Sequence, residues 1–132
     1  MATVWRELEM DCPAQQAWEA IADVGALHVK VAPGLVKDTS YDADTKTRMV
    51  TFESGNVLEE RIVGHDAELM RIAWNARSDD WAHHNAGLQV HDLGEGRCKV
   101  RWTADFWPDE VADGFGPMME AGLQAMKGVM ER

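Results

Sequence analysis

Cysteine is scarce in this sequence, which has only Cys12 and Cys98 among its 132 residues. Two cysteines so far apart are too few for a disulfide framework. The paired CxxC spacing of thiolate metal sites is absent as well. We therefore expect two free thiols and no metal site. We also expect no cofactor.

Long apolar runs and basic residues are also in short supply. No stretch approaches the roughly 20 apolar residues of a membrane helix, and the start, MATVWRELEMD, lacks the basic region and apolar run of a signal peptide. The chain has 13 Lys and Arg against 23 Asp and Glu, a formal net charge of -10. Such a charge repels phosphate backbones and anionic lipid surfaces. We expect a cytoplasmic protein that neither binds nucleic acid nor inserts into a membrane.

The chain is rich in large apolar side chains. Its 45% hydrophobic content is enough to build one core, and 132 residues is close to the commonest domain size. We expect a single domain over residues 1–132. Six Trp and eight Met either fill this core or line an adaptable apolar site, and composition does not decide between the two.

The first quarter of the chain predicts a strand and two short helices. Residues 3 to 11 alternate between apolar and polar side chains, which is typical of a half-buried strand. A helix follows with Pro13 in its first turn and ends near Gly25. Residues 27 to 31 can form a second short helical piece, which Pro33-Gly34 closes.

The middle of the chain predicts six more strands, and the end predicts a long helix. Turn residues at tight spacing separate strands at 35 to 42, 46 to 54, 56 to 64, 68 to 77, 83 to 92 and 97 to 107. Such short links favour an antiparallel meander. After Trp107-Pro108 the period becomes helical, with the regular part expected from near Pro117. The apolar stripe of this helix comprises Phe115, Met118, Met119, Gly122, Leu123, Met126, Val129 and Met130.

The order of these elements resembles the helix-grip fold of the START and pollen-allergen superfamily (SRPBCC), including its polyketide cyclase/dehydrase and lipid-transport branch. Three segments carry the resemblance: EMDCPAQQAWEAIADVGAL, RMVTFESGNVLEERIVGHDAELMRIAW and RCKVRWTADFWPD. The resemblance implies an α+β fold in which a seven-stranded curved antiparallel sheet surrounds a long C-terminal helix, with two short helices after the first strand. It also implies an apolar cavity between sheet and helix. Branches of the superfamily use this cavity to carry lipids, sense hormones, or cyclise and dehydrate polyketides.

Strand alternation predicts which side chains face that cavity, because one face of such a sheet looks at the last helix and the other at water. The apolar residues set the phase of most strands. Glu60 is placed inward by its likeness to the superfamily's Glu-Arg-apolar triplet. The expected ligand-binding residues are Arg6, Leu58, Glu60, Ile62, Ile72, Trp74, His84, Ala86, Leu88, Trp102, Phe106, Phe115, Met119 and Leu123.

Glu60 and His84 are the polar members of this inward set, with Arg6 beside them if the first strand has the expected phase. Burying such groups is unfavourable unless they are paired or hydrogen-bonded. One interpretation is that they orient the polar end of a ligand. The other is that Glu60 pairs with Arg6 or His84 at the rim of the sheet and contacts no ligand. If a reaction is catalysed, His84 is the candidate acid or base and Glu60 orients it.

Three functions remain open. The first is binding of an apolar or aromatic small molecule, such as a lipid or a polyketide-like metabolite. The second is a polyketide cyclase, aromatase or dehydratase that uses His84 and Glu60. The third is a partner-binding module without a small ligand. Both a monomer and a homodimer are compatible with the sequence, and the helix-grip order places Cys12 and Cys98 on neighbouring strands.

Overall fold

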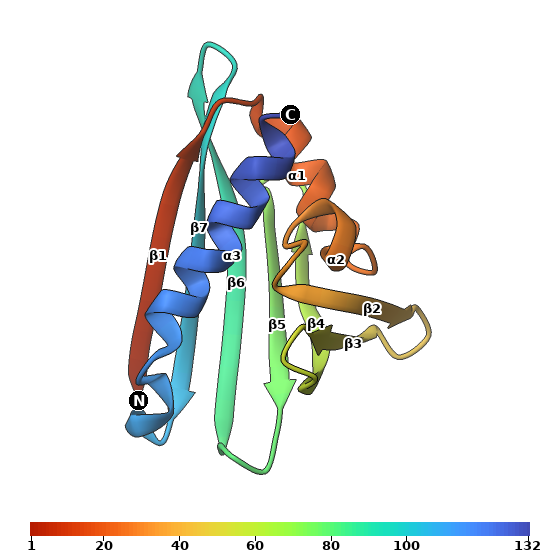
Figure 1. Cartoon of the computed structure of the whole chain (residues 1–132), viewed down its shortest axis with the longest axis vertical. Coiled ribbons are helices and arrows are strands. Elements are labelled where there is room, and N and C mark those ends of the chain that lie inside the picture. The colour runs from red at the N-terminus through yellow and green to blue at the C-terminus, as the bar shows by residue number, and fades with distance from the viewer.

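The computed structural model describes residues 1–132 and shows one seven-stranded antiparallel sheet with helices on one side (Figure 1). The strand order is β1-β7-β6-β5-β4-β3-β2. The elements are β1 (Ala2–Met10), α1 (Ala14–Ala22), α2 (Leu27–Lys30), β2 (Val36–Asp42), β3 (Thr47–Phe52), β4 (Val57–Asp66), β5 (Arg71–Arg77), β6 (His83–Gly94), β7 (Arg97–Trp107), η1 (Asp109–Ala112) and α3 (Phe115–Met130).

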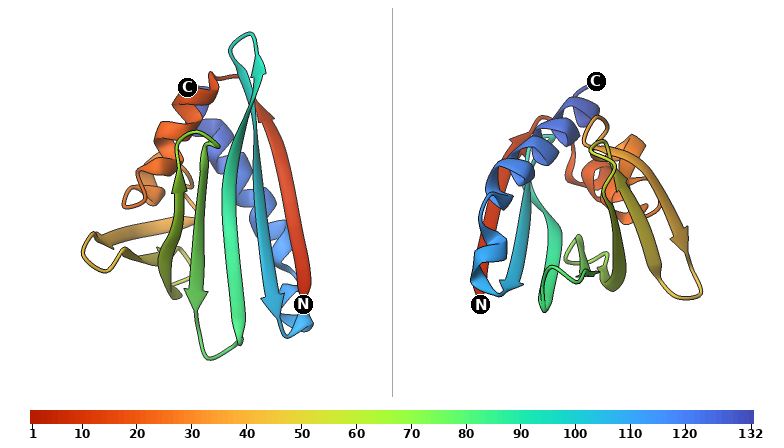
Figure 2. Two further views of the ribbon diagram at one scale, coloured as in Figure 1. Left: turned by 180° about the vertical axis from the view of Figure 1, so that it is seen from behind. Right: turned by 60° about the horizontal axis from the view of Figure 1, so that its bottom comes forward.

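The sheet is strongly curved, and α3 runs along its inner side (Figure 2). The short helices α1 and α2 cover the same side near the C-terminal end of α3, and they leave the opposite end of the sheet uncovered (Figures 1 and 2). The predicted α+β helix-grip architecture is therefore confirmed. None of the helices has the length and hydropathy needed to cross a lipid bilayer.

The first and last strands are neighbours. In their register Leu8 lies opposite Val100 and Met10 opposite Cys98. Cys12 lies two residues after Met10, and its Sγ lies 3.7 Å from that of Cys98, so both buried thiols are free but adjacent. Burial raises the pKa of the Cys98 thiol to about 12, which keeps it protonated and unreactive.

The hydrophobic core fills the space between the inner face of the sheet and the helices. From α1 it takes Ala17, Trp18 and Ile21. The helix α3 contributes Met119, Leu123, Met126 and Met130, all of them members of the predicted apolar stripe. Spacing at i, i+4, i+7 and i+11 puts these side chains on one face of the helix, which explains why α3 lies along the sheet.

Several boundaries shift by one to three residues from the sequence prediction, and two of these shifts have a clear physical reason. The helix α3 begins at Phe115 rather than near Pro117, because a proline in the first turn removes an N–H that has no intrahelical partner there. The strand β5 begins at Arg71 rather than at residue 68. The carboxylate of Asp66 accepts bonds from the N–H groups of Glu68 and Leu69, and this turn delays the strand.

Candidate functional site

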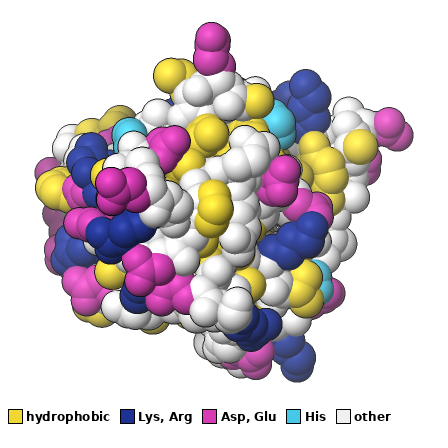
Figure 3. Space-filling view, turned by 90° about the horizontal axis from the view of Figure 1, so that it is seen from above, with side chains coloured by type: hydrophobic (Ala, Val, Ile, Leu, Met, Phe, Trp, Pro, Cys, Tyr) yellow, Lys and Arg dark blue, Asp and Glu magenta, His cyan; other side chains and the backbone are white.

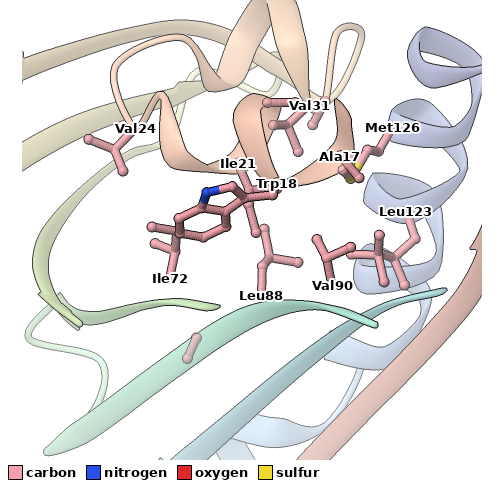
Figure 4. Packing of buried hydrophobic residues seen from close by; sticks show 14 of the residues in the cluster. Ala17, Trp18, Ile21, Val24, Val31, Ile72, Leu88, Val90, Leu123 and Met126 are labelled. Carbon is pink, nitrogen blue, oxygen red and sulfur yellow. The ribbon is translucent and has the colours of Figure 1, made fainter. Parts of the chain in front are cut away.

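An apolar pocket lies between the inner face of the sheet, the segment around α2, and α3. Eleven of its 14 lining residues are hydrophobic, so it favours apolar contents. The lining consists of Leu27, Val31, Ala32, Leu35, Val36, Arg48, Phe52, Glu60, Trp74, Leu88, Trp102, Gly122, Leu123 and Met126. Figure 4 shows part of this region, where Leu123 and Met126 on α3, Val31 beside α2 and Leu88 on the sheet lie around the core between helices and sheet.

The open space in this pocket is small. The centre of a water-sized sphere can move within about 40 Å³, whereas all the space between the lining atoms, part of it open to solvent, is about 480 Å³. The smaller volume is the one that compares with the volumes of known ligand cavities. Pockets for drug-sized ligands measure roughly 300–1,000 Å³. A ligand of that size therefore requires the lining side chains to move.

The polar part of the lining is a buried ion pair between neighbouring strands. Arg48 on β3 and Glu60 on β4 are directly opposite in the register, and Arg48 Nε donates to Glu60 Oε1 over 2.8 Å. Their side chains are only 2% and 7% exposed. Arg48 Nη1 also donates to the Val24 carbonyl at 3.3 Å, and the guanidinium carbon lies 4.8 Å from the centre of the Trp74 ring. The pair is thus held rigidly in an apolar surrounding.

Burial changes the chemistry of Glu60. Loss of solvent raises the pKa of its carboxyl, and the charge and hydrogen bond of Arg48 oppose that change without cancelling it. Arg48 Nη2 and Glu60 Oε2 form no hydrogen bond within the protein. Both residues line the pocket, so these two groups are available to its contents. The pocket therefore offers one donor group and one acceptor group to its contents.

An open groove continues from the pocket toward the uncovered end of the sheet. Leu35 and Phe52 line both spaces and stand between them. In the groove the centre of a water-sized sphere can move within about 460 Å³. The groove is lined by Gly34, Leu35, Phe52, Glu53, Ser54, Asn56, Val57, Leu58, Ser78, Asp80, Trp81, Phe115 and Met118. It adjoins the pocket at Leu35 and Phe52.

Half of the predicted ligand-binding residues border these spaces. Glu60, Trp74, Leu88, Trp102 and Leu123 line the pocket. Leu58 and Phe115 line the groove. The remaining members border neither space, and they are Arg6, Ile62, Ile72, His84, Ala86, Phe106 and Met119. Apart from Arg6, these residues are buried and fill the core around the pocket.

His84 is buried in an aromatic cluster, away from the ion pair. Its ring lies 4.2 Å from that of Phe106 and 5.0 Å from that of Trp81, measured between centroids, and Phe115 completes the cluster. Its Nδ1 has no hydrogen-bond partner. Burial, with a smaller contribution from the charge of His83, lowers the pKa of His84 to about 4. His84 is therefore neutral near pH 7.

The interpretation that pairs Glu60 with Arg6 or His84 names the wrong partner. Arg6 lies beneath α3 as its strand phase predicts, but its Nε bonds to Glu120 Oε1 at 2.8 Å and its side chain is 42% exposed. A Cβ on Gly116 would come within 2.2 Å of the Arg6 guanidinium, so the arginine occupies space that this glycine leaves free. Glu60 pairs with Arg48 instead of Arg6 or His84, because Arg48 is directly opposite on the adjacent strand.

Arg48 is the functional candidate that the sequence prediction missed. The sequence does contain a signal for it, because Arg48 shares the strand phase of Val50 and Phe52. An arginine in phase with apolar residues indicates a buried charge that needs a partner. The pocket residues from the segment around α2 carry no comparable signal. No group of three or more His, Cys, Asp or Glu side chains in residues 1–132 is placed to hold a metal ion.

Comparison with solved structures shows the same fold in several proteins. XoxI from Bacillus cereus superposes with a TM-score of 0.86 at 17% identity, over 98% of this chain and 96% of XoxI. A START superfamily protein from Mycobacterium smegmatis gives 0.77 at 15% identity, over 97% and 96%. The di-domain ARO/CYC BexL from the BE-7585A biosynthetic pathway gives 0.79 at 16% identity, over 97% of this chain and 46% of BexL.

Sequence comparison gives the family. No curated protein sequence matches the chain. The family model described as polyketide cyclase/dehydrase and lipid transport matches residues 1–132, the whole length described above. With its helix-grip fold and the apolar pocket between sheet and α3, the chain belongs to the polyketide cyclase/dehydrase and lipid transport family.

Proposed function

We propose that this protein binds an apolar or aromatic small molecule in the pocket between the sheet and α3, with the polar end of the ligand at the Arg48–Glu60 pair. The observation that carries the proposal is the free hydrogen-bonding capacity of this pair in an otherwise apolar lining. Mostly apolar walls with a few fixed polar groups are typical of small-molecule sites. The lipid-transport and cyclase activities in the family description are consistent with such a ligand.

The side chains that must move to admit a ligand are suited to moving. Leu35 and Phe52, which separate the pocket from the groove, are only half-buried. Met126 lines the far wall, and an unbranched thioether chain adopts many shapes at little energetic expense. A ligand entering from the groove would displace these groups while the sheet stays fixed. An internal space at Trp74 and Trp102 supports ligand binding over a partner module with a fully packed core.

A polyketide cyclase or dehydratase activity is the second candidate. The raised pKa of Glu60 beside an apolar space supports it, because burial favours the protonated form of this carboxyl, and a protonated carboxyl can act as a general acid. The aromatic surroundings of His84 do not support a part for it in that reaction, since its ring borders neither the pocket nor the groove. Glu60 acting with Arg48 is the pair that such an activity would use.

Intrinsic Trp fluorescence tests the binding proposal, since Trp74 and Trp102 line the pocket. The protein is titrated with sterols, flavonoids, long-chain lipids and aromatic polyketide mimics while its melting temperature is followed. Saturable quenching with a raised melting temperature is expected for at least one class, because a ligand that binds only the folded state stabilises it. The quenching should diminish in Trp102→Phe and persist in Trp5→Phe, whose indole lies on the outer face and is 50% exposed. No response from any class contradicts the proposal.

Turnover separates the two candidates. A bound polyketide mimic that is converted by the wild type, and not by Glu60→Gln, would establish an enzyme. Equal binding without conversion would leave a carrier.

A further inference from the structure

We infer that the pocket and its groove select neutral ligands that carry a carbonyl or hydroxyl oxygen, and disfavour ligands with a free carboxylate such as fatty acids. The inference rests on the proposed function and narrows its ligand class. Two separate features lead to it. One is the charge balance inside the pocket, and the other is the charge at its entrance.

Inside the pocket the buried charges already cancel. Arg48 and Glu60 are the only charged residues in the lining, they are in direct contact, and both are almost completely buried. A ligand carboxylate beside Arg48 would put two negative charges against one positive charge in an apolar space, and an uncompensated buried charge is strongly unfavourable. A neutral oxygen accepting from Arg48 Nη2 adds no charge. A hydroxyl hydrogen could also be donated to Glu60 Oε2.

An anion could enter this space only together with a proton, either on Glu60 or on the ligand itself. Its affinity would then fall as the pH rises, whereas the affinity of a neutral ligand would change little. The other charged or titratable groups of the groove are Glu53 and Asp80, both acidic, and neither supplies a compensating positive charge.

At the entrance the charge is of one sign. No Lys, Arg or His side chain lines the groove, and neither Glu53 nor Asp80 forms an ion pair. The polar hollow that shares Ser78 and Trp81 with the groove adds Glu59 and Asp79, with Arg77 as its only cation. An approaching carboxylate is therefore repelled before it reaches Leu35 and Phe52.

The opposite end of the molecule has a different charge pattern. Seen from above, basic and acidic side chains are intermixed there (Figure 3). Arg97 pairs with Asp11 at 2.7 Å, and Lys127 pairs with Glu131. The groove differs from that end in having no cation in its lining to balance its carboxylates.

The test compares ligands that share a hydrocarbon part and differ in charge: acetylnaphthalene against naphthoate, and decanol against decanoate. Affinities are measured by Trp quenching and by calorimetry near pH 7. The neutral member of each pair that binds should bind at least about tenfold tighter. Equal affinities, or a tighter carboxylate, would overturn the charge selection while leaving the pocket proposal standing. If no compound of either charge binds, the proposed function fails first, and the selection fails with it.

Variants then show which charged residues cause the preference for neutral ligands. Removing the entrance charges in Glu53→Gln/Asp80→Asn should raise the affinity for naphthoate a few-fold at low salt and leave acetylnaphthalene unchanged. The gain should shrink above about 0.1 M salt, where charges more than about 10 Å apart are screened. Glu68→Gln, at the β4–β5 turn away from the groove, is the matched control and should change neither ligand. An unchanged naphthoate affinity in the double variant would remove the entrance from the proposal.

Glu60→Gln makes the buried pair positive and should reverse the preference, raising the affinity for naphthoate about tenfold. This variant can also unfold, because Arg48 loses its counter-ion. In that case the entrance variants and the pH dependence of naphthoate binding still decide the question. A naphthoate affinity that does not fall between pH 5 and pH 8 contradicts the proposal that the charges of Arg48 and Glu60 already cancel.

Discussion

Glu60 and His84 both lie on the inner side of the same sheet, yet their surroundings are opposite. Glu60 has a counter-ion at 2.8 Å and borders an open pocket, whereas His84 has an unpartnered Nδ1 and is packed among aromatic rings. Burial drives both groups toward their neutral forms. The difference teaches that an inward ionisable residue indicates a site only when open space adjoins it.

The two groups also make stability depend on pH in opposite directions. For Glu60 the folded pKa is raised, so its contribution to stability is full below the ordinary value of 4.5 and is lost as the pH rises. For His84 the folded pKa is lowered from 6.5 to about 4, so the unfolded chain binds more protons between these values. Stability therefore falls as the pH drops through that range because of His84.

The largest expected effect comes from separating the ion pair. Arg48→Met leaves the Glu60 carboxylate buried without its partner, and breaking a buried pair in this way destabilises by about 3–5 kcal/mol. Urea unfolding at pH 7 measures the loss. The double variant Arg48→Met/Glu60→Leu removes both charges and should recover much of it. If the single variant is as stable as the wild type, the pair is less isolated from solvent than its geometry indicates.

The next effect isolates His84. His84→Phe keeps an aromatic ring in the cluster and removes the titrating group, so the variant should resist acid better than the wild type. The difference in unfolding free energy between the two proteins should grow as the pH falls from 6.5 to 4, by up to about 3 kcal/mol. Urea unfolding at several pH values gives both curves. Parallel curves across this range would show that His84 is protonated as easily in the folded chain as in the unfolded one.

The smallest effect concerns the open space beside Glu60, which has no counterpart around His84. A Cβ on Gly122 would lie 2.8 Å from the Trp102 ring and 3.3 Å from Leu35 Cδ2, inside the pocket. Gly122→Ala should therefore weaken ligand binding, and the clash should offset the gain of up to about 1 kcal/mol that alanine brings to a helix. Gly128→Ala, on the same helix with nothing within 4 Å, is the control.

Gly128→Ala should stabilise the protein by about 0.5–1 kcal/mol and leave binding unchanged. Melting curves and ligand titrations of the two variants give the comparison. Equal ligand affinity in both variants would mean that the space under Gly122 is not where the ligand lies.

Much of the fold could be predicted because its signals are local. Side-chain periodicity predicted the strands at 3 to 11 and 97 to 107 and the helix with its apolar stripe from Phe115 to Met130. The structure contains these elements with boundary shifts of a residue or two. The start of β5 was predicted three residues early. The Asp66 turn that delays it depends on side-chain bonds that a period does not reveal.

The site was less predictable, because it is assembled from distant segments. The inward phase of Glu60 and Trp74 was predicted from strand alternation and family likeness, and both line the pocket. Alternation also placed His84 inward, but it says nothing about whether space or another ring lies in front of a side chain. Arg48 escaped the prediction because its strand was not given a phase, although Val50 and Phe52 provide one.

By itself, the sequence determined the order of the elements, the face that most strands and the last helix bury, and the excess of negative charge, because these depend on neighbours along the chain. Only the tertiary structure decided that Arg48 and not Arg6 or His84 pairs with Glu60, that α2 closes one side of the pocket, and that Glu53 and Asp80 flank the same entrance. The physical reason is the curvature of the sheet, which brings β3, β4 and α3 around one space. Strand alternation specifies which way a side chain points, but not how far it lies from side chains on other elements.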